Sequence, residues 1–219
     1  LMGAINGTLV ARFGLPPFIA TLGMLNIARG LALVISELRP IYFNAQPGFN
    51  EFFMGSFLEQ MGLPDVPNLV FVFFGVAIVA GFILSKTVLG RYIFAIGSNE
   101  EATRLSGVRS MRYKASAYVI SGTMAGIAGV VIAARLNSAQ PAVGFGYELD
   151  AIAAAVIGGT SLAGGEGSIF GTVIGAFIIS VLTNGLRLLG VPQEWQITIT
   201  GIIVILAVYL DILRRRQNA

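Results

Sequence analysis

Long apolar runs separated by short polar segments dominate the chain. Six runs approach or reach the length of a membrane-spanning helix, at residues 13–36, 69–85, 115–134, 151–165, 167–186 and 195–210. A helix needs roughly 20 apolar residues to cross a hydrocarbon core about 30 Å thick. Because the runs are continuous rather than alternating, they predict helices and not the strands of a membrane barrel. A shorter run at residues 1–11 predicts part of a seventh span.

The run at residues 151–165 differs from the others in length and in glycine content. Its 15 residues would extend only about 22 Å at a rise of ~1.5 Å per residue. Residues 158–167 contain five glycines, and glycine at that density interrupts a helix. Two interpretations stay open, a broken helix beside a transport path and a tight turn between two short helices.

Pairs of glycines four residues apart recur in the apolar runs. They are Gly3 with Gly7, Gly122 with Gly126, and Gly171 with Gly175. Small residues one above another on a helix face let two backbones approach closely, which is how helices associate in lipid. These pairs predict a compact helical bundle rather than a particular activity.

Basic residues gather in three of the regions between the runs. Position 12, residues 86–114 and residues 214–216 hold 10 of the 14 Lys and Arg residues. Cytoplasmic loops of membrane proteins carry an excess of these residues. With the sides alternating from span to span, one orientation puts all three regions in the cytoplasm. It leaves residues 37–68, with four acids and one base, outside.

Composition supports a membrane protein and excludes several chemistries. The chain is 55% hydrophobic and 11% charged, with a mean hydropathy of +0.81, whereas soluble domains carry about 25% charged residues. It has no Cys and no His, which excludes disulfides, thiol nucleophiles, Cys/His metal sites and imidazole catalysis. We expect no catalytic residues, no metal site and no nucleic-acid binding. The sequence predicts an all-α, polytopic helical membrane protein with six full spans.

Residues 90–109 form a charged segment within this apolar chain. Ser98 and Glu101 fit a capping box, Arg104 lies toward the other end, where a cation complements the helix dipole, and Gly107 supplies a stop. The pattern predicts a short polar helix over residues 99–106. A loop that only reverses direction needs a few residues, so the length of residues 86–114 favours a surface that a partner grips. A solvated loop helix at the lipid headgroups is the alternative.

The same segment opens a series of motifs that resemble a known family. GRYIFAIGSNE at residues 90–100 is similar to the cytoplasmic loop of ribose-type monosaccharide ABC transporter permeases. Similar stretches are PPFIATL (16–22), ARLNSAQP (134–141), GYELDAIA (146–153), VIGGTS (156–161) and NGL (184–186). The resemblance covers nearly the whole chain. Family members typically have about ten spans, so the chain is expected to be a C-terminal portion that lacks roughly the first three.

The resemblance implies a single transmembrane permease domain over residues 1–219, in the cytoplasmic (inner) membrane of a bacterium, with a cytoplasmic C-terminus. Two partner ATPases would bind ATP and Mg²⁺, because this chain has no Walker A lysine after its glycine run. An extracytoplasmic sugar-binding protein would deliver the sugar, and a second permease subunit would complete a homodimer. The coupling helix, at residues 99–107, would sit in a cleft of the ATPase.

Three sets of candidate site residues follow. The ATPase-coupling interface comprises Asn99, Glu100, Glu101, Ala102, Arg104, Leu105, Ser106 and Gly107. The candidates for the translocation path are Thr21, Asn26, Gly158, Gly159, Thr160, Ser161 and Asn184. Polar groups inside spans mark such paths, and residues 158–161 belong to the glycine-rich helix break. The candidates for outer docking or gating are Asn137, Ser138, Gln140, Glu148 and Asp150.

Residues 37–68 are expected to be extracytoplasmic. Aromatic residues at helical spacing predict a helix over residues 49–61, which either lies on the bilayer or helps to dock an external partner. For the whole chain, the alternatives are an ABC permease for branched-chain amino acids or another small solute, an ion-coupled secondary transporter, and a membrane enzyme. The spans lack a central carboxylate, which disfavours ion coupling, and paired carboxylates for acid–base catalysis are missing.

Overall fold

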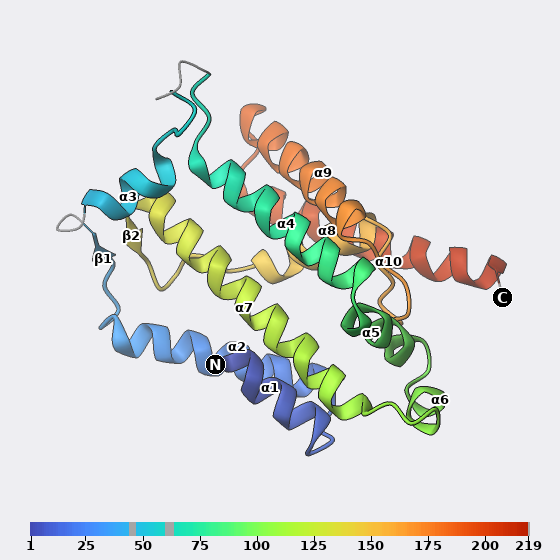
Figure 1. Ribbon diagram of the computed structural model, residues 1–219. Helices are drawn as coiled ribbons and strands as arrows, with labels where there is room; N and C mark the ends of the chain where they lie inside the picture. Colours follow the sequence, from blue (N-terminus) through green and yellow to red (C-terminus); the bar gives the residue numbers. More distant parts are fainter. Residues whose placement is uncertain (44–46, 60–63, 219) are drawn as a thin grey trace. The chain divides into compact units, whose positions relative to one another are not determined.

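The computed structural model describes residues 1–43, 47–59 and 64–218, and these residues are predominantly helical (Figure 1). The helices are α1 (Met2–Ala11), α2 (Pro17–Ile35), α3 (Pro47–Met54), α4 (Asn68–Lys86), α5 (Val88–Ser98), α6 (Glu100–Leu105), α7 (Ser110–Leu136), α8 (Tyr147–Ile157), α9 (Ile169–Leu188) and α10 (Gln193–Asn218). Two short strands, β1 (Ile41–Tyr42) and β2 (Ser138–Ala139), pair antiparallel. The predicted all-α class is confirmed.

Four helices of the described residues are long and apolar enough to cross a membrane, namely α2, α4, α7 and α9. Each coincides with a predicted span. The apolar part of α10, Gln193–Tyr209, falls just short of that length. The predicted span at 151–165 is wrong in its bounds, because α8 has 11 residues and ends before Gly158. Gly159, which follows Gly158, has a φ of +88°, and this conformation turns the chain out of the helix.

Contacts within the chain form two compact units. The first comprises residues 1–76 and 109–143, and the second comprises residues 77–108 and 144–219, so the division falls inside α4. The expectation of one permease domain stays a prediction.

In the first unit, α1 packs along α7 (Figure 1). A Cβ added at Gly122 of α7 would lie 2.8 Å from Gly3 Cα, and one added at Gly7 would lie 2.8 Å from the Ala115 oxygen. Both distances are below any real Cβ contact, so the two backbones touch only because side chains are absent here. Beside this pair, α3 packs against α7, and β1 pairs with β2 through Ile41 opposite Ala139 and Tyr42 opposite Ser138.

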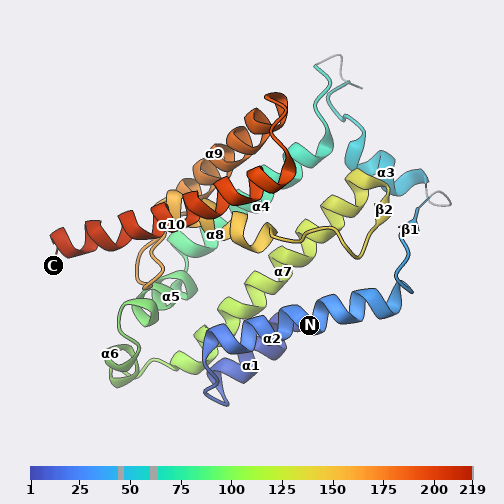
Figure 2. The same ribbon diagram turned by 180° about the vertical axis from the view of Figure 1, so that it is seen from behind.

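In the second unit, α9 and α10 pack against α8 (Figure 2). The buried residues Ala153, Ala154 and Ile179 form its core, and Ile203 and Val204 of α10 pack on them. Small side chains on α8 let α9 approach closely. A Cβ added at Gly175 would collide with the Ala154 oxygen, and one added at Gly158 would lie 2.6 Å from the Thr172 nitrogen.

Helix α5 is a structural element that the sequence interpretation missed. Thr87 caps it by accepting a hydrogen bond from the Gly90 N–H at 3.3 Å. Four of its half-buried side chains, Leu89, Tyr92, Ile93 and Ile96, follow the i, i+3, i+4, i+7 spacing of an amphipathic helix. That spacing is present in the sequence, next to the charges and capping signals of residues 98–107.

Candidate functional site

The predicted coupling helix exists as α6, with a different N-terminal cap. The side-chain oxygen of Asn99 accepts a hydrogen bond from the Ala102 N–H at 2.9 Å. The assignment of Ser98 as the cap is wrong, because α5 continues through Ser98. The chain first leaves helical geometry at Asn99, where φ is −155°, and the cap is the residue at that break.

The C-terminal stop of α6 lies where the sequence predicts it. Gly107 has a φ of +82°, and its N–H donates to the Arg104 oxygen at 3.0 Å. Glu100 and Glu101 occupy the first turn, and Arg104 lies in the last turn, which complements the helix dipole at both ends. The six-residue helix is therefore defined at each end by local chemistry.

The eight predicted coupling residues are all exposed. The buried residue of α6 is Thr103, which is 8% exposed and donates its hydroxyl to the Asn99 oxygen at 2.8 Å. Leu105 is 79% exposed, although burying a leucine side chain is worth roughly 1.5–3 kcal/mol. The helix thus presents polar groups and one large apolar side chain outward. Sequence reasoning missed Thr103, whose only signal is its position four residues after the cap.

Four of the predicted path residues lie together in the loop that follows α8. Gly158 caps α8, and the Thr160 hydroxyl lies 3.5 Å from the Thr172 hydroxyl of α9. Ser161 is 8% exposed, and its N–H donates to the Glu166 oxygen at 3.0 Å. The loop is closed by its own hydrogen bonds, but it joins the short α8 to the 20-residue α9 and not two short helices. A role for it in transport stays a prediction.

The other path candidates belong to both units. Asn184 is in the second unit but is not adjacent to this loop, and Thr21 and Asn26 are in the first unit. Asn184 is exposed on α9, about 18 Å along the helix from Thr172 at ~1.5 Å per residue. Thr21 donates its hydroxyl to the Pro17 oxygen of its own helix at 2.9 Å, the usual arrangement of an intramembrane threonine. Asn26 is exposed on the same helix.

The predicted outer docking residues fall into two groups. Asn137 ends α7 in a left-handed conformation with φ +49°. Ser138 is 1% exposed, and its hydroxyl donates to the Leu136 oxygen and accepts from the Gln140 amide, each at 3.1 Å. This serine therefore shapes the turn rather than a surface.

The second group lies in the first turn of α8, outside the four spanning helices. It comprises Glu148, which is exposed, and Asp150, which is half-buried. Partial burial raises the pKa of the Asp150 carboxyl, and the nearby Glu148 carboxylate raises it further.

Helix α3 covers part of the predicted aromatic helix at residues 49–61. Phe49 and Phe53 stack edge to face at 5.4 Å, whereas Phe52 is 67% exposed. The helix ends at Met54, which leaves Phe57 beyond it, and residues 60–61 lie outside the described residues. Both interpretations, a bilayer-surface helix and a docking surface, stay predictions.

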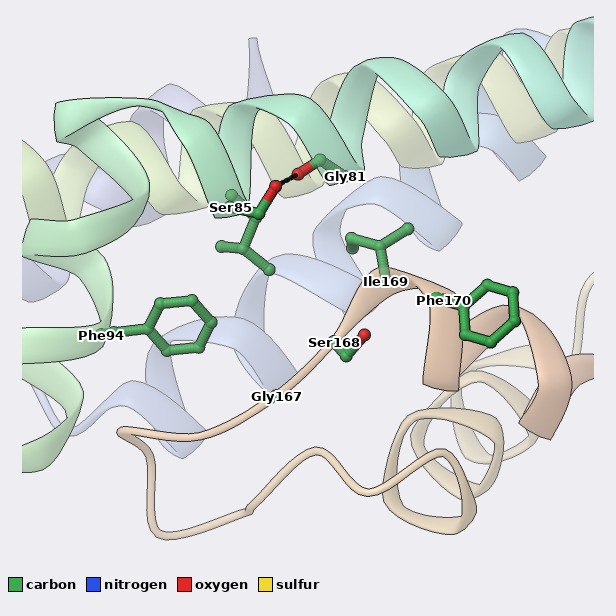
Figure 3. Close-up of a pocket in the computed structure, with 8 residues that line it drawn as sticks. Gly81, Ser85, Phe94, Gly167, Ser168, Ile169 and Phe170 are labelled. Atoms are coloured by element: carbon green, nitrogen blue, oxygen red, sulfur yellow. Dashed lines mark hydrogen bonds between the residues drawn. The ribbon is translucent and has the colours of Figure 1, made fainter.

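A cavity of about 210 Å³ lies between α4, the ring of Phe94 on α5 and the start of α9 (Figure 3). Ser85 lines it with its hydroxyl donated to the Gly81 oxygen at 2.7 Å, and Ser168 caps α9 by accepting from the Gly171 N–H at 3.4 Å. The hydroxyl groups of Ser85 and Ser168 are thus hydrogen-bonded within their own helices. Among the described residues, no group of three His, Cys, Asp or Glu residues could hold a metal ion.

The curated proteins most relevant to this arrangement are bacterial sugar permeases. The ribose import permease protein of Escherichia coli is 46% identical over 96% of this chain, and that of Bacillus subtilis is 44% identical over 98%. The fructose import permease protein of Rhizobium meliloti is 38% identical over 96%. The chain spans 64% of the length of each ribose permease and 59% of the fructose permease.

No solved structure matches the chain. A family model described as the permease component of branched-chain amino acid transport systems matches residues 1–208. The helical architecture, the spanning helices and this match agree, and the chain belongs to that family of transport permeases.

Proposed function

We propose that the chain is the transmembrane permease subunit of an ATP-binding-cassette importer that moves a monosaccharide of the ribose, xylose or galactose type. ATP hydrolysis belongs to a partner chain, and alternating access of the spans moves the sugar. The similarity to permeases named for ribose, D-allose and fructose supports a sugar. The description of the matching family favours branched-chain amino acids as the second candidate substrate.

The observation that carries the proposal is the outward face of α6. A short helix that is capped at one end, stopped at the other and exposed along its length, with Leu105 79% exposed, is suited to insertion into a partner. We assign this partner as an ATPase that holds ATP and Mg²⁺. An extracytoplasmic sugar-binding protein and a second permease subunit complete the proposed assembly.

The proposed orientation places α6 and the C-terminus in the cytoplasm of a bacterium, with the permease in its inner membrane. The distribution of Lys and Arg supports this orientation. Cysteines introduced singly at Ser106 and at Asp65 test it with a membrane-impermeant thiol reagent, because the chain has no cysteine of its own. We expect labelling of intact cells at position 65 alone.

Capture of the ATPase by the full-length permease tests the central assignment. We expect Leu105→Gln, Glu100→Lys and Gly107→Val each to weaken capture at least about tenfold, since hot-spot residues of an interface cost 2 kcal/mol or more. Leu189→Gln is the matched control, because Leu189 is 80% exposed at the end of α9. Equal capture by the α6 variants and the control, with uptake unchanged, would refute the coupling assignment.

A further inference from the structure

The end of α5, directly before α6, touches the glycine-rich loop between α8 and α9. A Cβ added at Gly97 would lie 2.7 Å from the Gly165 nitrogen, and one added at Gly164 would lie 2.5 Å from the Gly97 oxygen. A Cβ added at Gly165 would lie 3.1 Å from Ser98 Cα. Two backbone segments are therefore in direct contact at a point where only glycine fits. Gly164 and Gly165 also have φ values of +90° and +81°, a region that glycine adopts at no steric cost.

The loop on the other side of this contact is internally braced. The Thr160 N–H donates to the Ala155 oxygen of α8 at 2.9 Å, and the Ser161 N–H donates across the loop to the Glu166 oxygen at 3.0 Å. The Ser161 hydroxyl accepts from the Ala163 N–H at 3.1 Å. These bonds leave the loop few ways to deform without losing a hydrogen bond.

The braced loop is in turn fixed to the pair α8 and α9. Gly158 packs on Gly171, so that a Cβ added at Gly158 would lie 2.6 Å from the Thr172 nitrogen, and a Cβ added at Gly175 would lie 3.0 Å from the Gly158 nitrogen. Contacts between side chains can relax through rotamer changes, whereas contacts between backbones have no such freedom. A continuous series of backbone contacts thus runs from the base of α6 to α8 and α9.

We propose that Gly97, Gly164 and Gly165 are positioning residues that keep α6, the glycine-rich loop and the α8–α9 pair in one rigid body. When the ATPase displaces α6, the loop and α8 move with it rather than sliding past α5. This inference rests on the proposed function, because it needs a partner that moves α6. Its physical basis is a contiguous network of packed backbone, which carries coupling between separate sites.

A pair of introduced cysteines tests whether this contact persists through the ATPase cycle. The pair is Ser98→Cys with Gly165→Cys, since a Cβ added at Gly165 lies 3.1 Å from Ser98 Cβ. This distance is a few tenths of an ångström below the ~3.5–4.5 Å range of disulfides, so the two segments must separate by that amount for the bond to form. The full transporter, with its ATPase, is oxidised without nucleotide and after trapping with ATP and vanadate. We expect equal disulfide yields, within about twofold, in the two states. A yield at least fivefold lower in the trapped state, or no disulfide in either, would overturn the proposal.

A second variant keeps the proposal testable if the cysteine pair does not assemble. Gly97→Ala forces the loop away from α5, whereas Gly185→Ala on α9 meets nothing within 4 Å and is the matched control. In proteoliposomes we expect Gly97→Ala to capture the ATPase normally but to import at least fivefold less D-ribose per ATP hydrolysed than the control. An unchanged ratio would overturn the proposal. Failure of the wild-type permease to capture the ATPase would instead refute the proposed function.

Discussion

The two compact units use the same kind of glycine contact and differ in what lies beyond it. In the first unit, Gly3 and Gly7 of α1 contact α7, and α1 and α7 are continuous helices. In the second unit, Gly171 and Gly175 of α9 press on α8, which ends after 11 residues and gives way to a braced loop. That loop continues the contact to the end of α5 and the base of α6.

The difference shows that a glycine pair predicts a close approach but not its consequence. On α7, Gly122 contacts Gly3, whereas Gly126 has nothing within 4 Å. On α9, both members of the pair contact the backbone of α8 or its cap. The first contact joins two helices, and the second is one link in a longer series. Substitutions at each place separate these two roles.

The largest loss is expected where the second contact is tightest. Gly175→Leu would drive a side chain into the Ala154 backbone, and such overpacking costs about 3 kcal/mol or more. Thermal unfolding of the purified permease in detergent measures this loss of stability. Gly185→Leu, on the same helix in open space, is expected to stay within about 0.5 kcal/mol of the parent. Similar losses in both variants would contradict a specific contact.

A smaller loss is expected in the first unit, and only at one glycine of its pair. Gly122→Ala would place a methyl group 2.8 Å from Gly3 Cα and should destabilise by about 1–3 kcal/mol. Gly126→Ala should instead stabilise α7 by about 0.5–1 kcal/mol, because alanine is the better helix former. The same unfolding assay decides it, and a result of one sign for both substitutions would argue against the α1–α7 packing.

A local loss of helix stability is expected in α6, where the series of backbone contacts of the second unit ends. Asn99→Ala removes the cap that accepts from the Ala102 N–H, which costs about 1 kcal/mol and corresponds to roughly fivefold faster amide exchange. Hydrogen exchange should show the change in α6 and leave α1 and α7 at parent rates. Asn99→Asp, which retains the capping oxygen, is the control, and faster exchange in that variant as well would point away from the cap.

The smallest effect is expected at the hydroxyl pair between the loop and α9. Thr160 and Thr172 are 3.5 Å apart, which is long for O–H···O bonds, and Thr172 also donates to the Ser168 oxygen at 3.0 Å. Thr160→Val should therefore cost no more than about 0.5 kcal/mol. A loss above about 2 kcal/mol in the unfolding assay would show that this pair, rather than the glycine contacts, anchors the loop.

Most of the fold could be predicted from the sequence because long apolar runs have few alternatives in a membrane. The four spanning helices follow those runs, and the stop at Gly107 follows from glycine's tolerance of positive φ. The bounds of α8 were harder to predict. Its start at Tyr147 precedes the apolar run, because the polar residues Glu148 and Asp150 fit a first helical turn.

The candidate site was predictable where it depends on neighbouring residues and not where it depends on distant ones. The ends of α6 are determined by residues next to them in the chain, so the sequence indicated both ends to within one residue. The contact of Gly97 with Gly164 and Gly165 joins residues 67 and 68 positions apart, and no local pattern marks it. The burial of Ser138, proposed as a docking residue, likewise depends on its neighbours in space.

The ribbon of β1 and β2 has a consequence for biosynthesis. Ile41 and Tyr42 pair with residues made about a hundred positions later, and closing so long a loop carries an entropic cost that earlier contacts must offset. During translation the edge of β1 stays without its partner until α7 has been made and Ser138 has emerged. Helices α2 and α4 are thus synthesised before β1 acquires its partner strand.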